Sequence, residues 1–303
     1  MRRASASCLC AGRISSFFPL FHRLPTGRRV IPLLAPIFRG ELAPLGERLA
    51  CADAVPADAV RVADLVASRA RLLEVLQLQA RFRHSTGDDL RAVASAWILD
   101  YLEALLPPVV AAASVLHHVF PVQAAQIWLR LDARGGPVSF HIRQLGAACP
   151  GTRTAERYAP LLQHHLAPLF SALSSLTRLA PKILWGNAAR HLEPILGQAL
   201  ALTGGSEPIA QDMAYLLQSA TWPHAAEGGA EAGERSNPLF GRQREIRLVH
   251  EGRHTSFRLH RQCCLYYLLP HETHCNACPL SPAYRKGGEE EEEDAGAFEG
   301  PPA

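Results

Sequence analysis

The stretch RQCCLYYLLPHETHCNACPL, residues 261–280, decides how the C-terminal part of this chain folds and what it can bind. It holds half of the eight cysteines of the chain, spaced C-C-x10-C-x2-C. We call it the cysteine segment, and its four cysteines are the motif cysteines: Cys263, Cys264, Cys275 and Cys278. A deprotonated thiol is a soft metal ligand. Four of them in one short segment can complete the coordination of an iron–sulfur cluster or of a structural zinc ion.

The spacing alone leaves the choice of metal open. A C-x2-C places two sulfurs on one turn, and structural zinc sites commonly use two such pairs. The adjacent pair Cys263–Cys264 is different, because neighbouring side chains of an extended strand point to opposite faces. Two adjacent thiolates reach a cluster of several metal ions more easily than a single tetrahedral ion, if the backbone turns there. The pattern favours an iron–sulfur cluster, with zinc and no metal as alternatives.

Composition and charge describe an ordinary globular protein with two unusual ends. The 303 residues are 48% apolar and the formal net charge is +3. Residues 1–30 contain six arginines and no acidic residue, whereas Glu289–Asp294 is an unbroken acidic run. Between these ends the sequence has no basic cluster of the kind that nucleic-acid-binding proteins carry, so we expect no nucleic-acid partner.

No segment reaches the 18–20 or so uninterrupted apolar residues of a membrane-spanning helix. The most apolar stretch, Ala104–Leu116, contains Pro107 and Pro108 and is predicted to be a buried pair of helices. The N-terminal extension has no sustained apolar run, so it predicts no export signal; an organelle transit peptide is the weaker alternative. The thiols are therefore expected in a reducing cytoplasm. The cysteines expected not to be ligands are Cys8, Cys10, Cys51 and Cys149.

Hydrophobic periodicity predicts a mainly helical α+β fold. Helices are expected at 58–82, 89–106, 109–119, 154–179, 183–203 and 207–221. Alternating apolar residues predict two β-hairpins. The first lies within 125–145 and turns at Arg134-Gly135-Gly136, and the second lies within 244–262 and turns at Glu251-Gly252.

We therefore predict a helical body with two hairpins, followed by a small C-terminal cysteine-rich module. Five parts are expected: a disordered extension or mis-assigned start at 1–30, the body at 31–222, a linker at 223–238, the cysteine module at 239–283 and a disordered acidic tail at 284–303. The body-like sequence begins at Ile31, so translation is expected to start at Val30.

Several other residues invite a functional reading, and for each a structural role is the first expectation. The pairs His117–His118 and His164–His165 lack the i, i+4 spacing of a helical metal site. His271 and His274 lie within the cysteine segment, where four cysteines already complete a ligand set. Trp185 and Asn187 are each either core residues or part of a surface that touches the cysteine module or a substrate; these residues lie in the helix predicted at 183–203.

The cysteine segment resembles the C-terminal signature of the FhuF-like ferric-siderophore reductases, in which two adjacent cysteines, a Tyr-x-Leu-Pro segment and a C-x2-C occur together. The resemblance extends over most of residues 31–280 through three stretches: PLLAPIFRGELAPLG at 32–46, LWGNAA at 184–189 and NPLF at 237–240. One position departs from the family pattern, because Leu268 stands where an arginine usually precedes the Leu-Pro.

The resemblance implies that the four motif cysteines hold a [2Fe–2S] cluster, and that the chain is an oxidoreductase that reduces siderophore-bound Fe(III) to Fe(II) by one electron. It implies a ferric siderophore as substrate, in the first place of the hydroxamate type. An external electron-donor protein is also expected, because the chain has no nicotinamide or flavin motif of its own. The reaction would take place in the cytoplasm, with association to the inner face of the cytoplasmic membrane as a further possibility. The alternatives are a zinc-stapled binding protein without redox activity and an iron–sulfur electron carrier for another enzyme.

Overall fold

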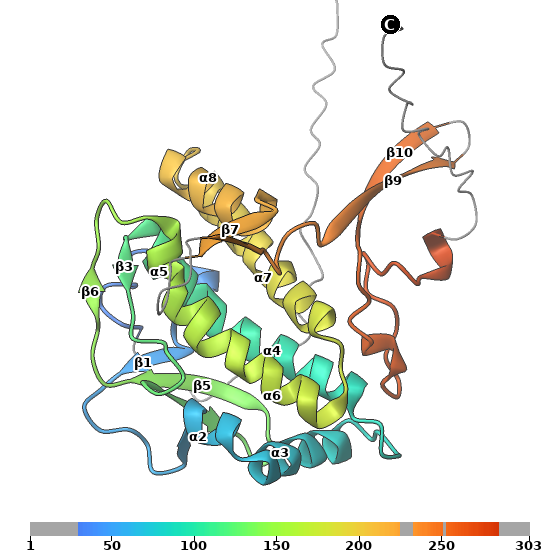
Figure 1. The fold of residues 1–303 in the computed structure, drawn as a ribbon, viewed down its shortest axis with the longest axis horizontal. Helices are drawn as coiled ribbons and strands as arrows, with labels where there is room; N and C mark the ends of the chain where they lie inside the picture. Colours follow the sequence, from blue (N-terminus) through green and yellow to red (C-terminus); the bar gives the residue numbers. More distant parts are fainter. Residues whose placement is uncertain (1–29, 225–232, 251–252, 285–303) are drawn as a thin grey trace, which may run out of the picture.

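The structure is a computed structural model that describes residues 30–224, 233–250 and 253–284. The predicted extension before Val30, the turn at Glu251-Gly252 and the acidic tail after Tyr284 lie outside the described residues. Within them the chain is a mainly helical α+β protein, as the sequence predicts (Figure 1).

The helical elements follow the chain in a simple order. The α-helices are α1 (Ala43–Gly46), α2 (Val62–Ala67), α3 (Arg69–Phe82), α4 (Arg91–Val110), α5 (Thr154–Leu161), α6 (Ala167–Thr177), α7 (Pro181–Leu202) and α8 (Glu207–Met213). Wider π-type turns extend two of these helices and join two others: η2 (Ala111–Val115) continues α4, η3 (Leu162–Leu166) joins α5 to α6, and η4 (Ala214–Gln218) continues α8. Short 3-10 turns are η1 (Gly40–Leu42), η5 (Tyr266–Leu268) and η6 (Pro282–Tyr284).

A small four-stranded sheet lies against one side of the helices, in the order β1-β5-β4-β2. Its strands are β1 (Leu49–Cys51), β2 (Ala59–Arg61), β4 (Ile127–Leu131) and β5 (Pro137–Ile142). The β4–β5 hairpin is the first predicted hairpin. Its tip is fixed by Asp132, whose Oδ1 accepts hydrogen bonds from the amides of Arg134 (2.8 Å) and Gly136 (2.7 Å), and by Gly135 at φ +76°.

Helix α4 occupies the centre of the fold, between α7 and the sheet (Figure 1). The prediction that a helix stops before Pro107 and a second one begins at 109 is wrong, because α4 and η2 run without interruption from Arg91 to Val115. Two prolines remove two backbone donors, which would break an exposed helix. Here Pro107 and Pro108 are both buried, and packing on all sides holds the helix together.

The joined helix Arg91–Val115 is long and apolar enough to cross a membrane by length and composition alone. The sequence had not predicted this, because the prolines divided the apolar run. However, 78% of its most apolar window is buried inside the fold, as is usual for the core helix of a globular protein. The core around α4 has an aromatic centre. The ring centroids of Trp97 and Tyr101 of α4 are 5.2 Å apart, and Tyr101 packs edge-on against Phe140 of β5, with ring centroids 4.9 Å apart.

The remaining helical predictions agree with the structure, with two local differences. The helix predicted at 58–82 begins as strand β2 and is divided into α2 and α3 at Ser68. The region predicted at 109–119 ends in strand β3 (His118–Val119), which pairs with β6 (Ala147–Ala148). Both differences arise at short strands whose partners are distant in the sequence, so a local pattern has little power to find them.

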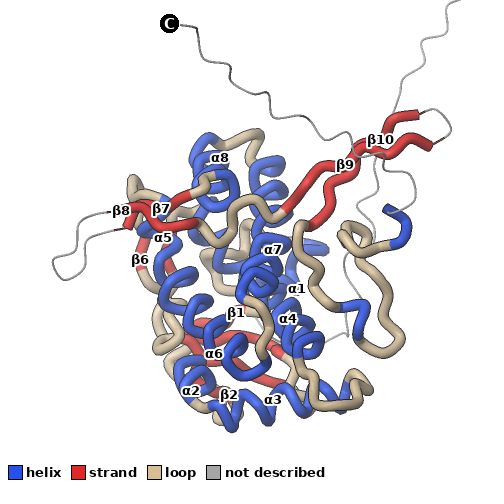
Figure 2. Tube along the Cα trace, turned by 45° about the vertical axis from the view of Figure 1, so that its right-hand side comes forward, coloured by secondary structure: helices blue, strands red, loops and turns tan. Residues whose placement is uncertain are grey.

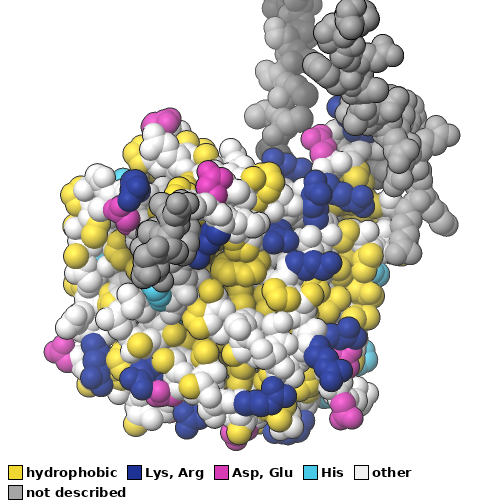
Figure 3. Space-filling model, in the orientation of Figure 1, with side chains coloured by type: hydrophobic (Ala, Val, Ile, Leu, Met, Phe, Trp, Pro, Cys, Tyr) yellow, Lys and Arg dark blue, Asp and Glu magenta, His cyan; other side chains and the backbone are white. Residues whose placement is uncertain are grey.

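The second predicted hairpin consists of β9 (Gln243–His250) and β10 (Arg253–His260), which pair antiparallel along their whole length. It projects from the helical body and leads directly into the cysteine segment (Figures 1 and 2). The predicted linker 223–238 begins in strand β7 (Thr221–His224) and contains strand β8 (Gly233–Ser236), which pairs with it; residues 225–232 lie outside the described residues. Basic side chains gather on the face where the hairpin meets the helices (Figure 3).

His165, one member of the predicted structural histidine pairs, is fully buried in this core. Its Nδ1 lies 2.5 Å from the carbonyl of Val122, so Nδ1 carries the proton. Its Nε2 then accepts the hydroxyl proton of Tyr101 at 2.5 Å. This arrangement needs a neutral imidazole, and burial lowers the pKa of His165 to about 4.

A histidine whose pKa is lower in the folded state than in the unfolded chain stabilises the fold above pH 6.5 and loses that contribution as the pH falls towards 4. We expect the free energy of unfolding of the native protein to drop by about 3 kcal/mol more than that of His165→Gln between pH 7 and pH 4. Urea unfolding followed by circular dichroism measures this difference. His164→Gln, at the exposed neighbour, is the control and should behave like the native protein; equal pH dependence in His165→Gln would refute the assignment.

Candidate metal centre

The structure brings the four motif cysteines together at the side of α4 and α7. The Sγ atoms of Cys263 and Cys278 are 3.8 Å apart, and the thiol of Cys264 is hydrogen-bonded by those of Cys263 and Cys275. Two sulfurs bound to one metal ion, at about 2.3 Å each and at a tetrahedral angle, lie about 3.8 Å apart. Cys263 and Cys278 are therefore spaced as two ligands of one metal ion would be. Cys264 and Cys278 are buried, while Cys263 and Cys275 are half-buried.

The backbone turns directly after the adjacent cysteines, as shared coordination requires. Leu265 adopts a left-handed conformation at φ +62°, which is uncommon for a residue with a side chain. As a result its amide donates to Cys263 Sγ at 3.3 Å, and the amide of Tyr266 donates to the sulfur of Cys264. At the other end the amide of Cys278 donates to the carbonyl of Cys275 at 3.0 Å and closes the C-x2-C turn. Amides aimed at sulfur stabilise thiolates, so the local backbone fits a metal-binding role.

The cysteine segment has little apolar core of its own and packs on the helical body. Leu269 is buried, and Leu265 and Tyr266 pack beside it. The surface that receives them is made of small side chains from the end of α3 and the first half of α4: Ala80, Ala92, Val93 and Ala96. The guanidinium of Arg83 lies 5.9 Å from the centre of the Tyr266 ring. The body therefore fixes the position of the segment.

A buried chain of hydrogen bonds ties this segment to two helices. Asn187 of α7 donates from Nδ2 to Ser95 Oγ at 2.9 Å, and Ser95 Oγ donates to the carbonyl of Cys264 at 2.6 Å. Both side chains are fully buried. Asn187 is thus a hydrogen-bonded core residue, the first of the two interpretations that the sequence left, and it reaches the cysteine segment only through Ser95. Trp185 packs edge-on against Phe170 at 4.9 Å.

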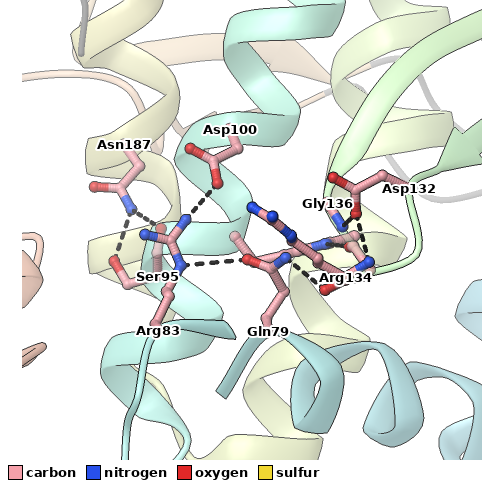
Figure 4. A network of polar contacts seen from close by, with 10 residues as sticks. Gln79, Arg83, Ser95, Asp100, Asp132, Arg134, Gly136 and Asn187 are labelled. Atoms are coloured by element: carbon pink, nitrogen blue, oxygen red, sulfur yellow. Dashed lines mark hydrogen bonds and ion pairs between the residues drawn. The ribbon is translucent and has the colours of Figure 1, made fainter. Parts of the chain in front are cut away.

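The same face of α4 carries a second polar network (Figure 4). Arg83 forms an ion pair with Asp100 at 2.5 Å and donates to Gln79 Oε1 at 3.2 Å. Gln79 in turn donates to the carbonyl of Arg134 in the β4–β5 hairpin at 2.8 Å. The network links α3, α4 and the hairpin beneath the surface that receives the cysteine segment, and so stiffens that surface.

Arg190 of α7 is a residue of this site that the sequence did not single out. Its Nη1 lies 3.8 Å from Cys275 Sγ, and its Nη2 donates to the carbonyl of Gln262. Hydrogen bonds from Cys263 and Cys275 lower the pKa of Cys264, and the charge of Arg190 acts in the same direction. The sequence held one weak signal for it: Arg190 lies three residues after Asn187 and therefore on the same side of the predicted helix.

The other candidate ligands lie away from the sulfurs or have other contacts. The ring of His274 stacks on Tyr267 at 4.4 Å, and His271 is exposed. Cys51 lies in β1, and Cys149 follows β6. Cys8 and Cys10 lie outside the described residues. Among residues 30–224, 233–250 and 253–284, no group of three or more histidine, cysteine or acidic side chains, the motif cysteines included, is placed as a set that could hold a metal ion.

A comparison with protein families matches residues 95–256 to the family described as "Ferric iron reductase FhuF-like transporter". The chain belongs to the FhuF-like ferric iron reductase family. The matched region contains Ser95, Asn187 and Arg190, which lie beneath the cysteine segment, and it ends before the motif cysteines. Family membership therefore covers the body that supports the site. The metal-binding role of the cysteines depends on their own chemistry and geometry.

Comparison with curated proteins gives no match. Among solved structures, aerobactin synthetase IucA from a hypervirulent pathotype of Klebsiella pneumoniae is 15% identical, with a TM-score of 0.48 over 60% of this chain and 38% of that one. Petrobactin biosynthesis protein AsbB from Bacillus anthracis is 11% identical, with a TM-score of 0.38 over 48% of this chain and 30% of that one. The chain thus spans less than two-fifths of the length of these proteins, and the likeness is a partial one.

We expect Ser95→Ala to loosen the cysteine segment selectively. The change leaves the buried carbonyl of Cys264 without its donor, and leaves Asn187 Nδ2 with only the longer bond to the Ser95 carbonyl at 3.4 Å, at a cost of about 1–3 kcal/mol. Amide hydrogen exchange of residues 262–270 should become about tenfold faster or more, relative to the rest of the fold.

Ser114→Ala is the matched control. Ser114 is equally buried and bonds to Tyr158 and Asp212, away from the cysteine segment. It should lower the global stability without a selective effect on residues 262–270. A uniform change in both variants would mean that Ser95 does not anchor the segment.

Proposed function

We propose that the chain reduces siderophore-bound Fe(III) to Fe(II) through a [2Fe–2S] cluster held by the four motif cysteines. The observation that carries the proposal is the convergence of four thiols beside Arg190, on the body of a ferric iron reductase family member. The donor set fits the cluster, because all-cysteine ligation by four thiolates is its common form. The left-handed turn at Leu265 and the amides directed at sulfur fit it as well.

The proposed reaction is a one-electron transfer, so the protein does not have to supply a general acid or base for that step. When bound, such a cluster supplies one electron at a time at a low potential. Siderophores hold Fe(III) with hard oxygen donors, and Fe(II), with its lower charge density, is held much more weakly. One electron taken up by the iron is therefore enough to release it, and water protonates the freed oxygens. Hydroxamate oxygens remain the first expectation for these donors.

The residues of the chain have three tasks in this scheme. The motif cysteines hold the redox group, and the amides of Leu265 and Tyr266 stabilise its sulfurs. Ser95 and Asn187 fix its distance from the body. Arg190 places a positive charge next to Cys275, which favours the more negative, reduced state and so raises the reduction potential.

The electron is proposed to come from a separate donor protein, and the reaction to take place in the cytoplasm. The four motif cysteines, Cys51 and Cys149 are all free thiols, which fits a reducing compartment. Association with the inner face of the cytoplasmic membrane stays a prediction.

We expect serine at any one of the motif cysteines to remove most of the iron, the acid-labile sulfide and the visible absorbance. A serine oxygen is a harder ligand that suits sulfide-bridged iron poorly. Replacing Cys8, Cys10, Cys51 and Cys149 together is the control and should leave all three quantities unchanged. Loss of a full cluster equivalent in the control would refute the ligand set, and a colourless native protein with stoichiometric zinc would establish the zinc alternative.

The reductase activity itself is tested anaerobically. The protein is reduced, freed from excess reductant, and mixed with ferric hydroxamates, catecholates and carboxylates while a chelator traps Fe(II). Saturable reoxidation with about one Fe(II) released per electron, from at least one chelate, is the expected result. A protein that stays reduced against every chelate would overturn the proposal in favour of an electron carrier.

A further inference from the structure

A cavity of about 300 Å³ lies next to the cysteine segment, between α7, η4 and the base of the β9–β10 hairpin. Its size is at the lower end for small-molecule sites, so it can hold one arm or face of a larger ligand. Met213, Leu217 and Phe240 form its apolar side. Its polar side is formed by Arg190, Arg242, Arg258, His260 and Glu193. Arg190 is thus shared between the cavity and the sulfur of Cys275.

Two of the three arginines have no acidic partner among the described residues. Arg242 donates to the carbonyl of Pro238 and, at 3.3 Å, to Gln262 Oε1. Arg190 donates to the carbonyl of Gln262 and to the sulfur of Cys275. Only Arg258 is paired, with Glu193 at 3.1 Å. The cavity therefore has a net positive charge, and burial lowers the pKa of Arg242, as expected for a guanidinium without a counter-ion.

Two residues that line the cavity have a buried side-chain nitrogen without a partner among the described residues. These atoms are Nε2 of His260 and Nε of Arg190. His260 is 9% exposed, and its amide donates to the carbonyl of Ala277 in the cysteine segment at 2.9 Å. Both atoms are covered by the protein itself, so the net charge of the cavity, and not these two nitrogens, points to the kind of ligand it can hold.

A second hollow of about 1060 Å³ is larger, but its charges are already neutralised. Its arginines are Arg153, paired with Glu156 at 2.7 Å, and Arg157, paired with Asp212 at 2.5 Å. His117, which lines the second hollow, also has a buried nitrogen without a partner among the described residues, so this feature does not distinguish the two sites. Their positions differ. Gln211 and Tyr215 line the second hollow, whereas Met213 and Leu217, on another side of the same helix, line the cavity beside the cysteine segment.

We infer that the cavity between α7 and the β9–β10 hairpin binds a ferric chelate of net negative charge, whose carboxylate or other anionic oxygens meet Arg190, Arg242 and Arg258. This inference rests on the proposed function, because it names the charge class of that substrate. Arg190 then contacts both the chelate and Cys275, which keeps the path for the electron short. Basic side chains gathered on this face would also attract such a chelate from solution (Figure 3).

The test uses one trihydroxamate scaffold in three charge forms: with a free terminal amine, with the amine acetylated, and with the amine succinylated. Their gallium(III) complexes are cationic, neutral and anionic, have the same metal coordination, and are not reduced. At low ionic strength, calorimetry on the complete protein should give about tenfold tighter binding of the anionic form than of the neutral form, and the cationic form should bind weakest. Salt should reduce the difference.

The double variant Arg242→Gln/Arg258→Gln should lose this preference, and Arg242→Lys/Arg258→Lys should keep most of it. Arg153→Gln, which removes one charge at the other hollow, is the control and should keep it in full. Equal affinity for the three complexes, or a preference that survives in the double glutamine variant, would overturn the inference.

The iron(III) complexes of the same three compounds, mixed with reduced protein, separate this inference from the proposed function. Reoxidation that is fastest with the anionic complex supports both. If the three complexes reoxidise the protein at the same rate despite their different charges, the inference is overturned and the reductase proposal stands. Preferential binding of the anion without reoxidation by any complex supports the cavity assignment and overturns the reductase proposal.

Discussion

The position of the motif cysteines depends on one buried hydrogen-bonded chain, from Asn187 through Ser95 to the carbonyl of Cys264. The cysteine segment buries few apolar side chains, so it cannot hold four sulfurs together without outside support. The support comes from Ser95, which is 169 positions from Cys264, and from Asn187, which is 92 positions from Ser95. A polar anchor suits this role better than apolar contact alone, because its partners must meet at one distance and one angle, and an apolar surface would allow the segment to slide.

Helix α7 couples this anchor to the cavity. Gly186, Asn187, Arg190 and Glu193 follow one another at spacings of one and three residues and so share one side of the helix. Along that side the helix holds the segment through Asn187, touches a sulfur through Arg190, and meets the hairpin through Glu193, which pairs with Arg258 and accepts from Gln243. The segment, the cavity and the hairpin are therefore positioned against a single rigid element, and a shift of α7 would move all three together.

The sequence predicts much of this fold and the identity of the candidate ligands, because both depend on local patterns. Alternation finds the two hairpins, the 3.6-residue period finds α7, and the spacing of Cys263, Cys264, Cys275 and Cys278 marks them as one set. It does not predict that α4 continues through Pro107 and Pro108, since the packing that outweighs two lost hydrogen bonds comes from other parts of the chain. Nor does it predict the arginine cavity. Arg190 lies 52 positions before Arg242, and Arg258 lies 16 positions after it. The net charge of the body is close to zero, and only the fold brings these three arginines together.

The charge of the site explains why Arg190 and Arg242 have no acidic partner among the described residues. Four thiolates in one segment repel one another, and a nearby positive charge lowers the free energy of the ionised set. A carboxylate paired with Arg190 or Arg242 would cancel that effect and would also repel an anionic chelate. The hydrogen bonds of both arginines go instead to neutral groups, the carbonyls of Pro238 and Gln262, the Gln262 amide oxygen and a sulfur, which fix the guanidinium groups without neutralising them. In the proposed function, the same unneutralised charge would stabilise the thiolates on one side and hold the substrate on the other. It would then tie the binding of the chelate to the place where we propose that its iron is reduced.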